Sequence, residues 1–281
     1  MMTSKGKDGM GRRSRFARSP TGKQIFLTDR DTAILRWLYR YRYLRATRLA
    51  AFIQPKSEKR FIERLGDLYH ETGLVDRPPA QWRRFDARYQ PIIYELSAKG
   101  MHYLAGQGEL PDRAVTFAKD GQHGAAPHFD HAMMIVDALV AVELATRKET
   151  SQRFVPVDEI LARMPAATTK TAKHPLAISV TIKPNGHLPA VKTPFTTHLV
   201  PDALFGIEHV INGEKLYRFY ALECENRSPQ SRYTAKLSSL ALKQAAYEAL
   251  IQSRRYREVW RIPCLELRVV KPNTQKQRIA A

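Results

Sequence analysis

Three features are scarce in this sequence, and each scarcity excludes a class of protein. Cysteine occurs only as Cys224 and Cys264, too few for a disulfide framework, so we expect a protein of a reducing cytoplasm. Long apolar runs are missing. The best candidate, residues 132–145, contains Asp137 and Glu143, which predicts that no segment spans a membrane. The amino terminus has no apolar stretch of the kind that directs secretion, so we expect no export.

Acidic residues are also few relative to basic ones. The 27 Asp and Glu face 46 Lys and Arg, giving a formal net charge of +19, which points to a polyanion as partner. A length of 281 residues allows about two domains. Residues 1–24 are basic and offer almost nothing to bury, so we predict a disordered arm. The arm could lie along phosphates or in a minor groove, or it could be a solvated tail.

Residues 25–106 have the pattern of a small helical domain with a short sheet. Apolar residues at helical spacing, such as Ile34, Leu35 and Leu38, alternate with residue types that start or end helices. The expected boundaries are Thr28 for the start of the first helix, Pro55 for the end of the second, Ser57 and Gly73 for the third, and Ser97 for the start of the last. A strand is expected at residues 91–96.

Basic residues are dense on the third helix and in the loop that follows it. This layout and the segment IIYELSAKGMHYLA resemble a winged helix-turn-helix, in which the third helix enters the major groove of DNA. The predicted DNA-binding residues are Lys56, Lys59, Arg60, Arg64, Arg77, Arg83, Arg84 and Arg88. The alternative is a winged helix that contacts proteins and has a basic face that is merely solvated.

Residues 107–127 contain Gly and Pro and are expected to be a linker. A second domain is predicted for residues 128–272, and residues 273–281 are expected to be a loose basic tail. We expect helices at about 129–147 and 233–253, strands at 154–157, 256–262 and 265–270, and an accessory hairpin of 177–183 with 188–191. His128 and His131 in the motif HFDH lack a convincing third ligand, which favours capping and packing over metal binding.

The most informative segment of the second domain is PDALFGIEHVINGEKLYRFYALECE, residues 201–225. Asn212-Gly213 between two apolar runs predicts a two-residue β-hairpin turn. Pairing Ile211 with Glu214 then places Asp202 opposite Glu223, and Glu225 shares their face. A register slip or bulge would instead spread these carboxylates along an edge.

The order of elements from 129 to 270, with Asp202 before one strand and Glu223 at the end of the next, resembles the PD-(D/E)XK nuclease core. That resemblance implies a restriction-endonuclease-like αβββαβ core with a mixed sheet, in which Asp202 and Glu223 hold Mg²⁺ or Mn²⁺. Glu225 stands where the family has lysine, and a carboxylate cannot stabilise a developing negative charge as an ammonium can. Lys236 or Lys243 of the following helix could replace the lysine, so the catalytic candidates are Asp202, Glu223, Glu225, Lys236 and Lys243.

The two halves together predict an α+β protein, a winged helix-turn-helix followed by the nuclease-like domain. This combination resembles the replication-relaxation proteins of bacterial plasmids and mobile elements, through TDRDTAILRWLYRYRYL, YELSAKGMHYLA, HAMMIVDAL and PDALFGIE…YALECEN. The resemblance implies a cytoplasmic bacterial protein that binds double-stranded DNA in replication, relaxation or mobilisation. Two alternatives stay open: a metal-dependent DNA endonuclease, and a factor that recruits a replication initiator or relaxase. A homodimer is also compatible with the sequence.

Overall fold

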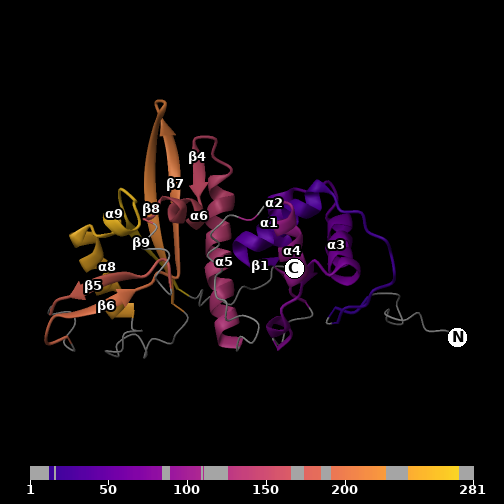
Figure 1. The fold of residues 1–281 in the computed structure, drawn as a ribbon, viewed down its shortest axis with the longest axis horizontal. Coiled ribbons are helices and arrows are strands. Elements are labelled where there is room, and N and C mark those ends of the chain that lie inside the picture. Colours follow the sequence, from indigo (N-terminus) through magenta and orange to yellow (C-terminus); the bar gives the residue numbers. More distant parts are fainter. Residues whose placement is uncertain are drawn as a thin grey trace. The chain divides into compact units, whose positions relative to one another are not determined.

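The computed structural model describes residues 13–15, 17–83, 89–108, 110, 126–165, 174–184, 191–225 and 240–271. The chain divides into two compact units, residues 1–136 and 137–281, and both combine helices with strands (Figure 1). The α+β class predicted from the sequence is therefore confirmed. In the described part of the chain, every helix is too short or too polar to cross a membrane.

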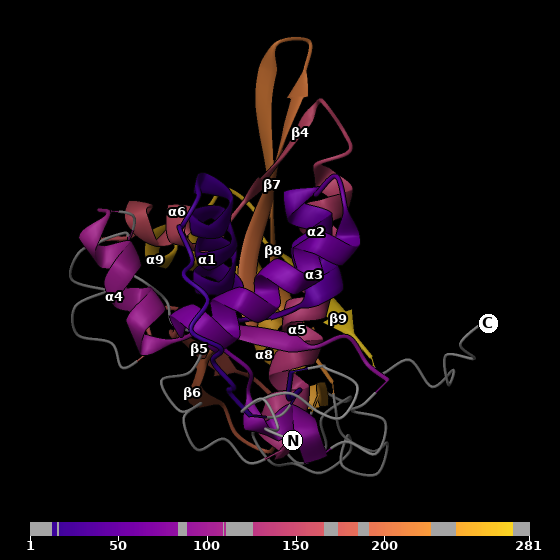
Figure 2. The same ribbon diagram turned by 90° about the vertical axis from the view of Figure 1, so that its right-hand side faces the viewer.

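The first unit contains a three-stranded antiparallel sheet in the order β1-β3-β2, and Figure 2 shows the helices α1 to α4 of this unit. Its elements are α1 (Asp29–Tyr41), β1 (Tyr43–Arg45), α2 (Ala46–Ile53), α3 (Glu58–Asp67), the π-helical turn η1 (Leu68–Thr72), β2 (Val75–Asp76), the 3₁₀ turn η2 (Pro79–Arg83), β3 (Ile93–Leu96) and α4 (Ala98–Gly106). The strand at 43–45 was not predicted from the sequence. Three residues are too few to show a period of their own, and pairing with β3 defines this strand.

The predicted helix boundaries of the first unit are confirmed. Thr28 and Asp31 form a reciprocal capping box at the start of α1. Ser57 accepts from the Arg60 N–H at 3.4 Å, and Ser97 accepts from the Gly100 N–H at 3.0 Å. Such caps satisfy backbone donors that would otherwise lack a partner.

The core of the first unit also follows the predicted pattern. Ile34, Leu35 and Leu38 of α1 are completely buried, and Leu65 of α3 is buried with them. Burial of one apolar stripe per helix is the main source of stability for helices of this length.

The segment before α1 differs from the disordered arm that we expected. Residues 13–27, apart from residue 16, are described, and we call them the strap. Strap cations meet acids at the end of α3 and beyond it: Arg13 Nη2 lies 2.8 Å from Asp67, and Lys23 Nζ lies 2.6 Å from the same carboxylate. These acids are more than forty residues away in the chain, so local composition could not reveal the pairing.

The boundary between the units falls inside α5 (Ala126–Thr146), whereas the sequence placed it at residue 128. The first part of this helix packs on the small sheet of the first unit. Phe129 stands edge-on to Tyr43 with ring centroids 5.2 Å apart, and Met133 is buried in the same cluster.

The second unit has a mixed four-stranded sheet in the order β4-β7-β8-β9. The first three strands are antiparallel, and β9 runs parallel to β8. Its elements are β4 (Gln152–Val155), α6 (Val157–Arg163), β5 (Ile178–Ile182), β6 (Phe195–Leu199), β7 (Ala203–Ile211), β8 (Glu214–Cys224), α8 (Leu240–Ser253), α9 (Tyr256–Val259) and β9 (Glu266–Val270).

The predicted hairpin register is confirmed along the whole β7–β8 pair, from Ile211↔Glu214 to Ala203↔Leu222. Asn212 and Gly213 have φ of 53° and 83°, as a type I′ turn requires. The regular register excludes a bulge between these strands. Asp202 therefore stands opposite Glu223, one position beyond the last pair.

Two predicted elements are wrong. Residues 256–259 form a helical turn in place of a strand, because Tyr256 and Trp260, four residues apart, are both buried and the Trp260 N–H donates to the Tyr256 carbonyl at 2.9 Å. The partner of β5 is β6, residues 195–199, in place of residues 188–191. The Asn185-Gly186 turn expected there lies outside the described residues.

Candidate functional site

The β7–β8 hairpin brings two of the predicted catalytic carboxylates together. Asp202 precedes β7, and its Oδ2 accepts from the backbone N–H of Cys224 at 2.8 Å. Glu223 lies near the end of β8 and is 3% exposed. The backbone hydrogen bond fixes the Asp202 carboxylate beside the strand that carries Glu223, so the two acids share one end of the hairpin.

Helix α8 supplies a lysine and a tyrosine to this pair. The Lys243 ammonium donates to Glu223 Oε2 and lies 3.9 Å from Asp202 Oδ1. The Tyr247 hydroxyl donates to Glu223 Oε1 at 2.7 Å. Residues four apart lie on one face of a helix, so a single face of α8 contacts both oxygens of Glu223. We call Asp202, Glu223, Lys243 and Tyr247 the carboxylate cluster.

The electrostatics of the cluster follow from burial and from its mixed charges. Burial and the neighbouring Asp202 charge raise the pKa of Glu223. Burial acts to lower the pKa of Lys243, but the charges of Asp202 and Glu223 outweigh it and raise that pKa. Burial and the Glu223 charge also raise the pKa of the Tyr247 phenol. The ammonium and the phenol therefore keep their protons and hold the Glu223 carboxylate between them.

Of the remaining catalytic candidates, Glu225 belongs to the described residues and Lys236 does not. Glu225 is half-buried, its N–H donates to the Val270 carbonyl at 2.8 Å, and its charge contributes to the raised pKa of Lys243. Lys236 lies outside the described residues, as does the side chain of His128. Within the described ranges, no three His, Cys, Asp or Glu side chains gather closely enough to hold a metal ion by themselves.

Tyr247 was missed as a site residue by sequence reasoning, although it was placed on the inward stripe of the predicted helix. Its position four residues after Lys243 was the available signal. A buried tyrosine needs a partner for its hydroxyl, and the only way to identify that partner was to know which strand the helix covers.

The predicted DNA-binding residues fall into three groups. Lys56, Lys59 and Arg60 are exposed at the start of α3 and just before it. Arg64 and Arg77 contact other residues of the first unit. Arg84 and Arg88 lie outside the described residues, and so does the side chain of Arg83.

Arg64 and Arg77 have contacts that explain their positions without DNA. Arg64 donates to Asp31 through Nε at 2.9 Å and through Nη2 at 2.6 Å. Arg77 is buried, its guanidinium lies 4.0 Å from the centre of the Tyr69 ring, and its Nη1 donates to the Arg15 carbonyl at 3.1 Å. One arginine joins α3 to α1, and the other joins the strap to the sheet.

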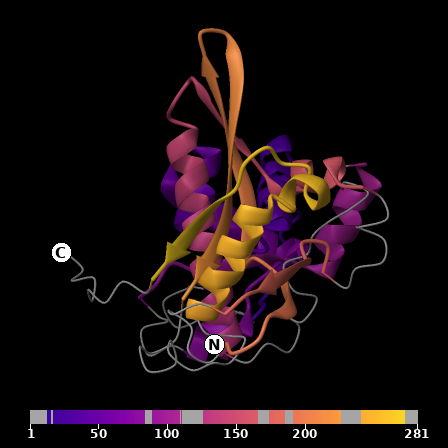
Figure 3. The ribbon, with the colours of Figure 1, turned by 90° about the vertical axis from the view of Figure 1, so that its left-hand side faces the viewer.

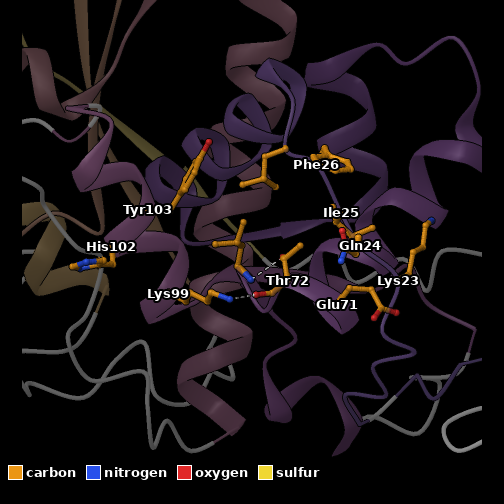
Figure 4. A pocket seen from close by; sticks show the side chains of 11 residues that line it. Lys23, Gln24, Ile25, Phe26, Glu71, Thr72, Lys99, His102 and Tyr103 are labelled. Carbon is orange, nitrogen blue, oxygen red and sulfur yellow. Dashed lines mark hydrogen bonds between the residues drawn. The ribbon is translucent and has the colours of Figure 1, made fainter.

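The first unit also contains a cavity of about 620 Å³ between the strap and α4. Figure 4 shows Phe26 and Tyr103 on one side and Lys99 near Thr72 on the other. The Lys99 ammonium donates to the Thr72 carbonyl at 2.7 Å, and Phe26 is 82% exposed. None of the residues predicted to bind DNA or metal lines this cavity.

The comparisons with known proteins identify a family. No curated protein and no solved structure matches the chain. A family model described as replication-relaxation matches residues 35–260, which include α3, the β7–β8 hairpin and α8. With the greater part of its length matched, the chain belongs to the replication-relaxation family.

Proposed function

We propose that this protein binds double-stranded DNA in the replication, relaxation or mobilisation of a plasmid or another mobile element. Membership of the replication-relaxation family suggests such a role. The net charge of +19 supports a nucleic acid as the partner. The first unit acts as a winged helix, and α3 is the element that enters the major groove.

The arrangement of the first unit supports this proposal. Helices α1, α2 and α3 precede the β2–β3 pair, and β1 completes a small antiparallel sheet. This is the order expected of a winged helix-turn-helix. The segment between β2 and β3, which would form the wing, contains Arg83, Arg84 and Arg88.

The observation that carries the proposal is the exposed cationic start of α3. Lys59 and Arg60 are exposed in its first turn, next to exposed Lys56, whereas Arg64 one turn later is paired with Asp31. The N-terminal residues of a recognition helix are the ones that reach base edges and phosphates. We therefore assign DNA contact to Lys56, Lys59 and Arg60, and a structural role to Arg64.

A fluorescence anisotropy titration with duplex DNA over a range of salt concentrations tests this assignment. Lys59→Ala and Arg60→Ala should each weaken binding and reduce the slope of log K against log salt by about one unit for each phosphate that the variant no longer neutralises. Arg257→Ala removes an exposed charge of the second unit and serves as the matched control. Equal weakening in all three variants would reject the role of α3.

A second candidate function is metal-dependent DNA cleavage, and the position of Lys243 favours it. The sequence lacks the lysine two residues after Glu223, and α8 brings another ammonium to the same carboxylate. The strand order β4-β7-β8-β9, with α5 before it and α8 before β9, also agrees with the expected αβββαβ core. Lys243 would stabilise negative charge that develops on a phosphate.

The carboxylate oxygens of the cluster are the type of ligand that a hard divalent cation prefers. Magnesium is commonly held by one or two carboxylates together with substrate phosphates and water, and Asp202 and Glu223 provide the two carboxylates. A divalent ion bound there would act as a Lewis acid and lower the pKa of its water. Lys243 would have to release Glu223 Oε2 for that oxygen to become a ligand, since the ammonium contacts it directly.

Calorimetric titration of Mn²⁺ tests this second function without a substrate. Wild type should bind the ion, and Asp202→Ala should not. DNA cutting that requires Mg²⁺ or Mn²⁺ and disappears in both Asp202→Ala and Lys243→Ala would establish cleavage. Wild type that neither binds Mn²⁺ nor cuts supercoiled, linear or single-stranded DNA would leave DNA binding as the function.

A further inference from the structure

The β7–β8 hairpin leaves one strand edge open near its tip. Strand β8 pairs with β7 from Glu214 to Leu222, but β9 covers only Tyr220 to Cys224 on the other side. In the described part of the chain, no strand pairs with the outer side of β8 at residues 214–219. Figure 3 shows β9 beside the lower part of β8 and the tip of the hairpin extending past it.

The direction of the backbone groups along β8 identifies which residues form this edge. The Cys224 N–H points toward the β7 side, where it donates to Asp202, and the Glu225 N–H points the other way, to Val270. Backbone groups alternate along a strand, and the unbroken register keeps this alternation as far as the turn. Lys215 and Tyr217 therefore direct their N–H and C=O groups outward.

The side chains at this edge combine charges with one exposed aliphatic residue, since Glu214, Lys215 and Arg218 lie on either side of Leu216. Leu216 is 51% exposed, and Val210 and Ile211 on the paired strand β7 are 43% and 53% exposed, so all three are among the most exposed large hydrophobic residues of the described chain. An open strand edge with exposed apolar side chains is a template for pairing with another strand.

We propose that the occupant of this edge is a second copy of the same chain, paired antiparallel to β8 about a two-fold axis at Leu216. An isologous contact requires that the segment be complementary to itself. In this register Leu216 meets Leu216 of the second copy, Glu214 meets Arg218, and Lys215 meets Tyr217. Each copy thus places its acid opposite the base of the other copy.

The neighbouring registers are less favourable. Outward-facing residues must pair with outward-facing residues, so the two-fold axis must pass through a residue, and the nearest alternatives are Lys215 and Tyr217. An axis at Lys215 puts two ammonium groups opposite each other, and like charges directly opposite destabilise a sheet. An axis at Tyr217 puts Leu216 opposite Arg218 and requires backbone pairing at Phe219, which is buried.

The backbone of the chosen register can be satisfied. Lys215 and Tyr217 of the two copies would exchange N–H and C=O hydrogen bonds. The Tyr217 carbonyl already accepts from Cys264 Sγ at 3.3 Å, but a thiol is a weak donor and a carbonyl has a second lone pair. The Lys215 ammonium lies 3.3 Å from Glu208 on its own hairpin, an ion pair that does not involve the backbone groups of Lys215.

This edge contact is short, so the dimer should depend on protein concentration. Sedimentation equilibrium without DNA or metal should show wild type converting from monomer to dimer as its concentration rises. Glu214→Arg and Arg218→Glu should each abolish the dimer, because each places like charges across the axis. The double variant Glu214→Arg/Arg218→Glu should restore it. Glu258→Arg reverses an exposed charge on α9, outside the strand that would pair, and should dimerise like wild type.

A covalent trap tests the position of the axis. Residues on the axis of a non-hydrogen-bonded pair have Cα atoms about 4.5 Å apart, a separation that a disulfide can bridge. Mild oxidation should link Leu216→Cys into a covalent dimer and should not link Ile211→Cys, which is equally exposed but away from the axis. Wild type measures the background of covalent dimer that forms through Cys224 and Cys264.

Three results would overturn the proposal: a wild type that stays monomeric at every concentration, single charge variants that dimerise as well as wild type, or a double variant that stays monomeric while folded by circular dichroism. These measurements contain no DNA, so they are independent of the outcome of the binding titration. Were the pairing observed, it would join two DNA-binding units in one complex and raise their effective concentration on DNA.

Discussion

Glu95 of β3 is a carboxylic acid in a position that disfavours its charge. It stands opposite Asp76 of β2 on one side and Tyr43 of β1 on the other. Burial raises the pKa of Glu95 to about 7, Arg42 acts to lower it, and Asp76 raises it further. The folded state therefore favours the protonated form well above the usual pKa of a glutamate.

This pKa predicts a stability change with pH. A folded pKa above the unfolded one means that the contribution of Glu95 is complete below about pH 4.5 and is lost as pH rises through about 7. Glu95→Gln should therefore exceed wild type in free energy of unfolding at pH 8, by up to about 3 kcal/mol, and the difference should vanish at low pH. Urea denaturation at several pH values measures it.

The comparison between variant and wild type is necessary because His70 acts in the opposite direction. Burial, together with Arg77 and Arg13, lowers its pKa to about 4. Its contribution to stability therefore falls as pH falls from about 6.5 to 4. If Glu95→Gln changed the free energy of unfolding equally at pH 5 and pH 8, the raised pKa of Glu95 would be contradicted.

Arg64 should behave as a structural residue. Its partner Asp31 is 1% exposed and belongs to the capping box of α1. Arg64→Ala leaves this carboxylate without its cation and should lower the free energy of unfolding by about 2 kcal/mol. Arg60→Ala, on the exposed side of α3, should change it by less than about 0.5 kcal/mol. Thermal denaturation of the two variants distinguishes them, and equal melting temperatures would contradict the structural role of Arg64.

At the scale of elements, α4 provides a test within a single helix. A Cβ built on Gly100 would lie 2.2 Å from the Leu74 carbonyl oxygen, whereas a Cβ on Gly106 would meet nothing within 4 Å. Gly100→Ala should force α4 away from the end of the α3–β2 connection and destabilise the first unit by about 2 kcal/mol. Gly106→Ala should be neutral or slightly stabilising, because alanine favours helix. Chemical denaturation distinguishes them, and equal effects would contradict this close approach.

Local signals predicted the elements that they control. The caps at Thr28, Ser57 and Ser97 and the Asn212-Gly213 turn depend on a few consecutive residues, and the structure has them as predicted. The hairpin turn also fixed the position of Asp202 against Glu223, because register propagates along a regular strand pair.

Elements defined by distant partners were harder to predict. Residues 256–262 have a strand-like composition, but residues 256–259 form a helical turn because this turn buries both Tyr256 and Trp260. The approach of Lys243 to Glu223 could not be decided from helical spacing, because it depends on the orientation of α8 against the sheet. The open edge of β8 likewise depends on where β9 begins to pair.

At the scale of the whole molecule, the net charge does not measure the charge available to DNA. Arg13 pairs with Asp67 and Glu71, Lys23 pairs with Asp67, and Arg18 pairs with Asp76. These strap cations looked free in the sequence because their acids follow some fifty residues later. The described strap thus contributes to the fold of the first unit, and our proposal assigns DNA contact to the exposed cations at the start of α3.

This division of charge predicts a reciprocal pair of phenotypes. Arg13→Ala leaves the buried carboxylates of Asp67 and Glu71 with one donor fewer, so it should lower the free energy of unfolding by about 2 kcal/mol. Its slope of log K against log salt should match that of wild type, because the variant keeps every cation that neutralises a phosphate. Lys59→Ala should keep the stability of wild type and reduce the slope by about one unit.

Thermal denaturation and anisotropy titrations on the same two proteins measure both quantities, below the melting temperature of the weaker variant. An Arg13→Ala protein that is as stable as wild type and has a reduced salt slope would show that the strap leaves Asp67 and Glu71 when DNA binds. In that case the ion pairs in the free protein would compete with phosphates for the strap, and raising salt would weaken both interactions together. The unchanged slope is expected because releasing Arg13 would expose two carboxylates that are 8% and 3% exposed in the fold, and their repulsion of the DNA backbone would oppose the contact.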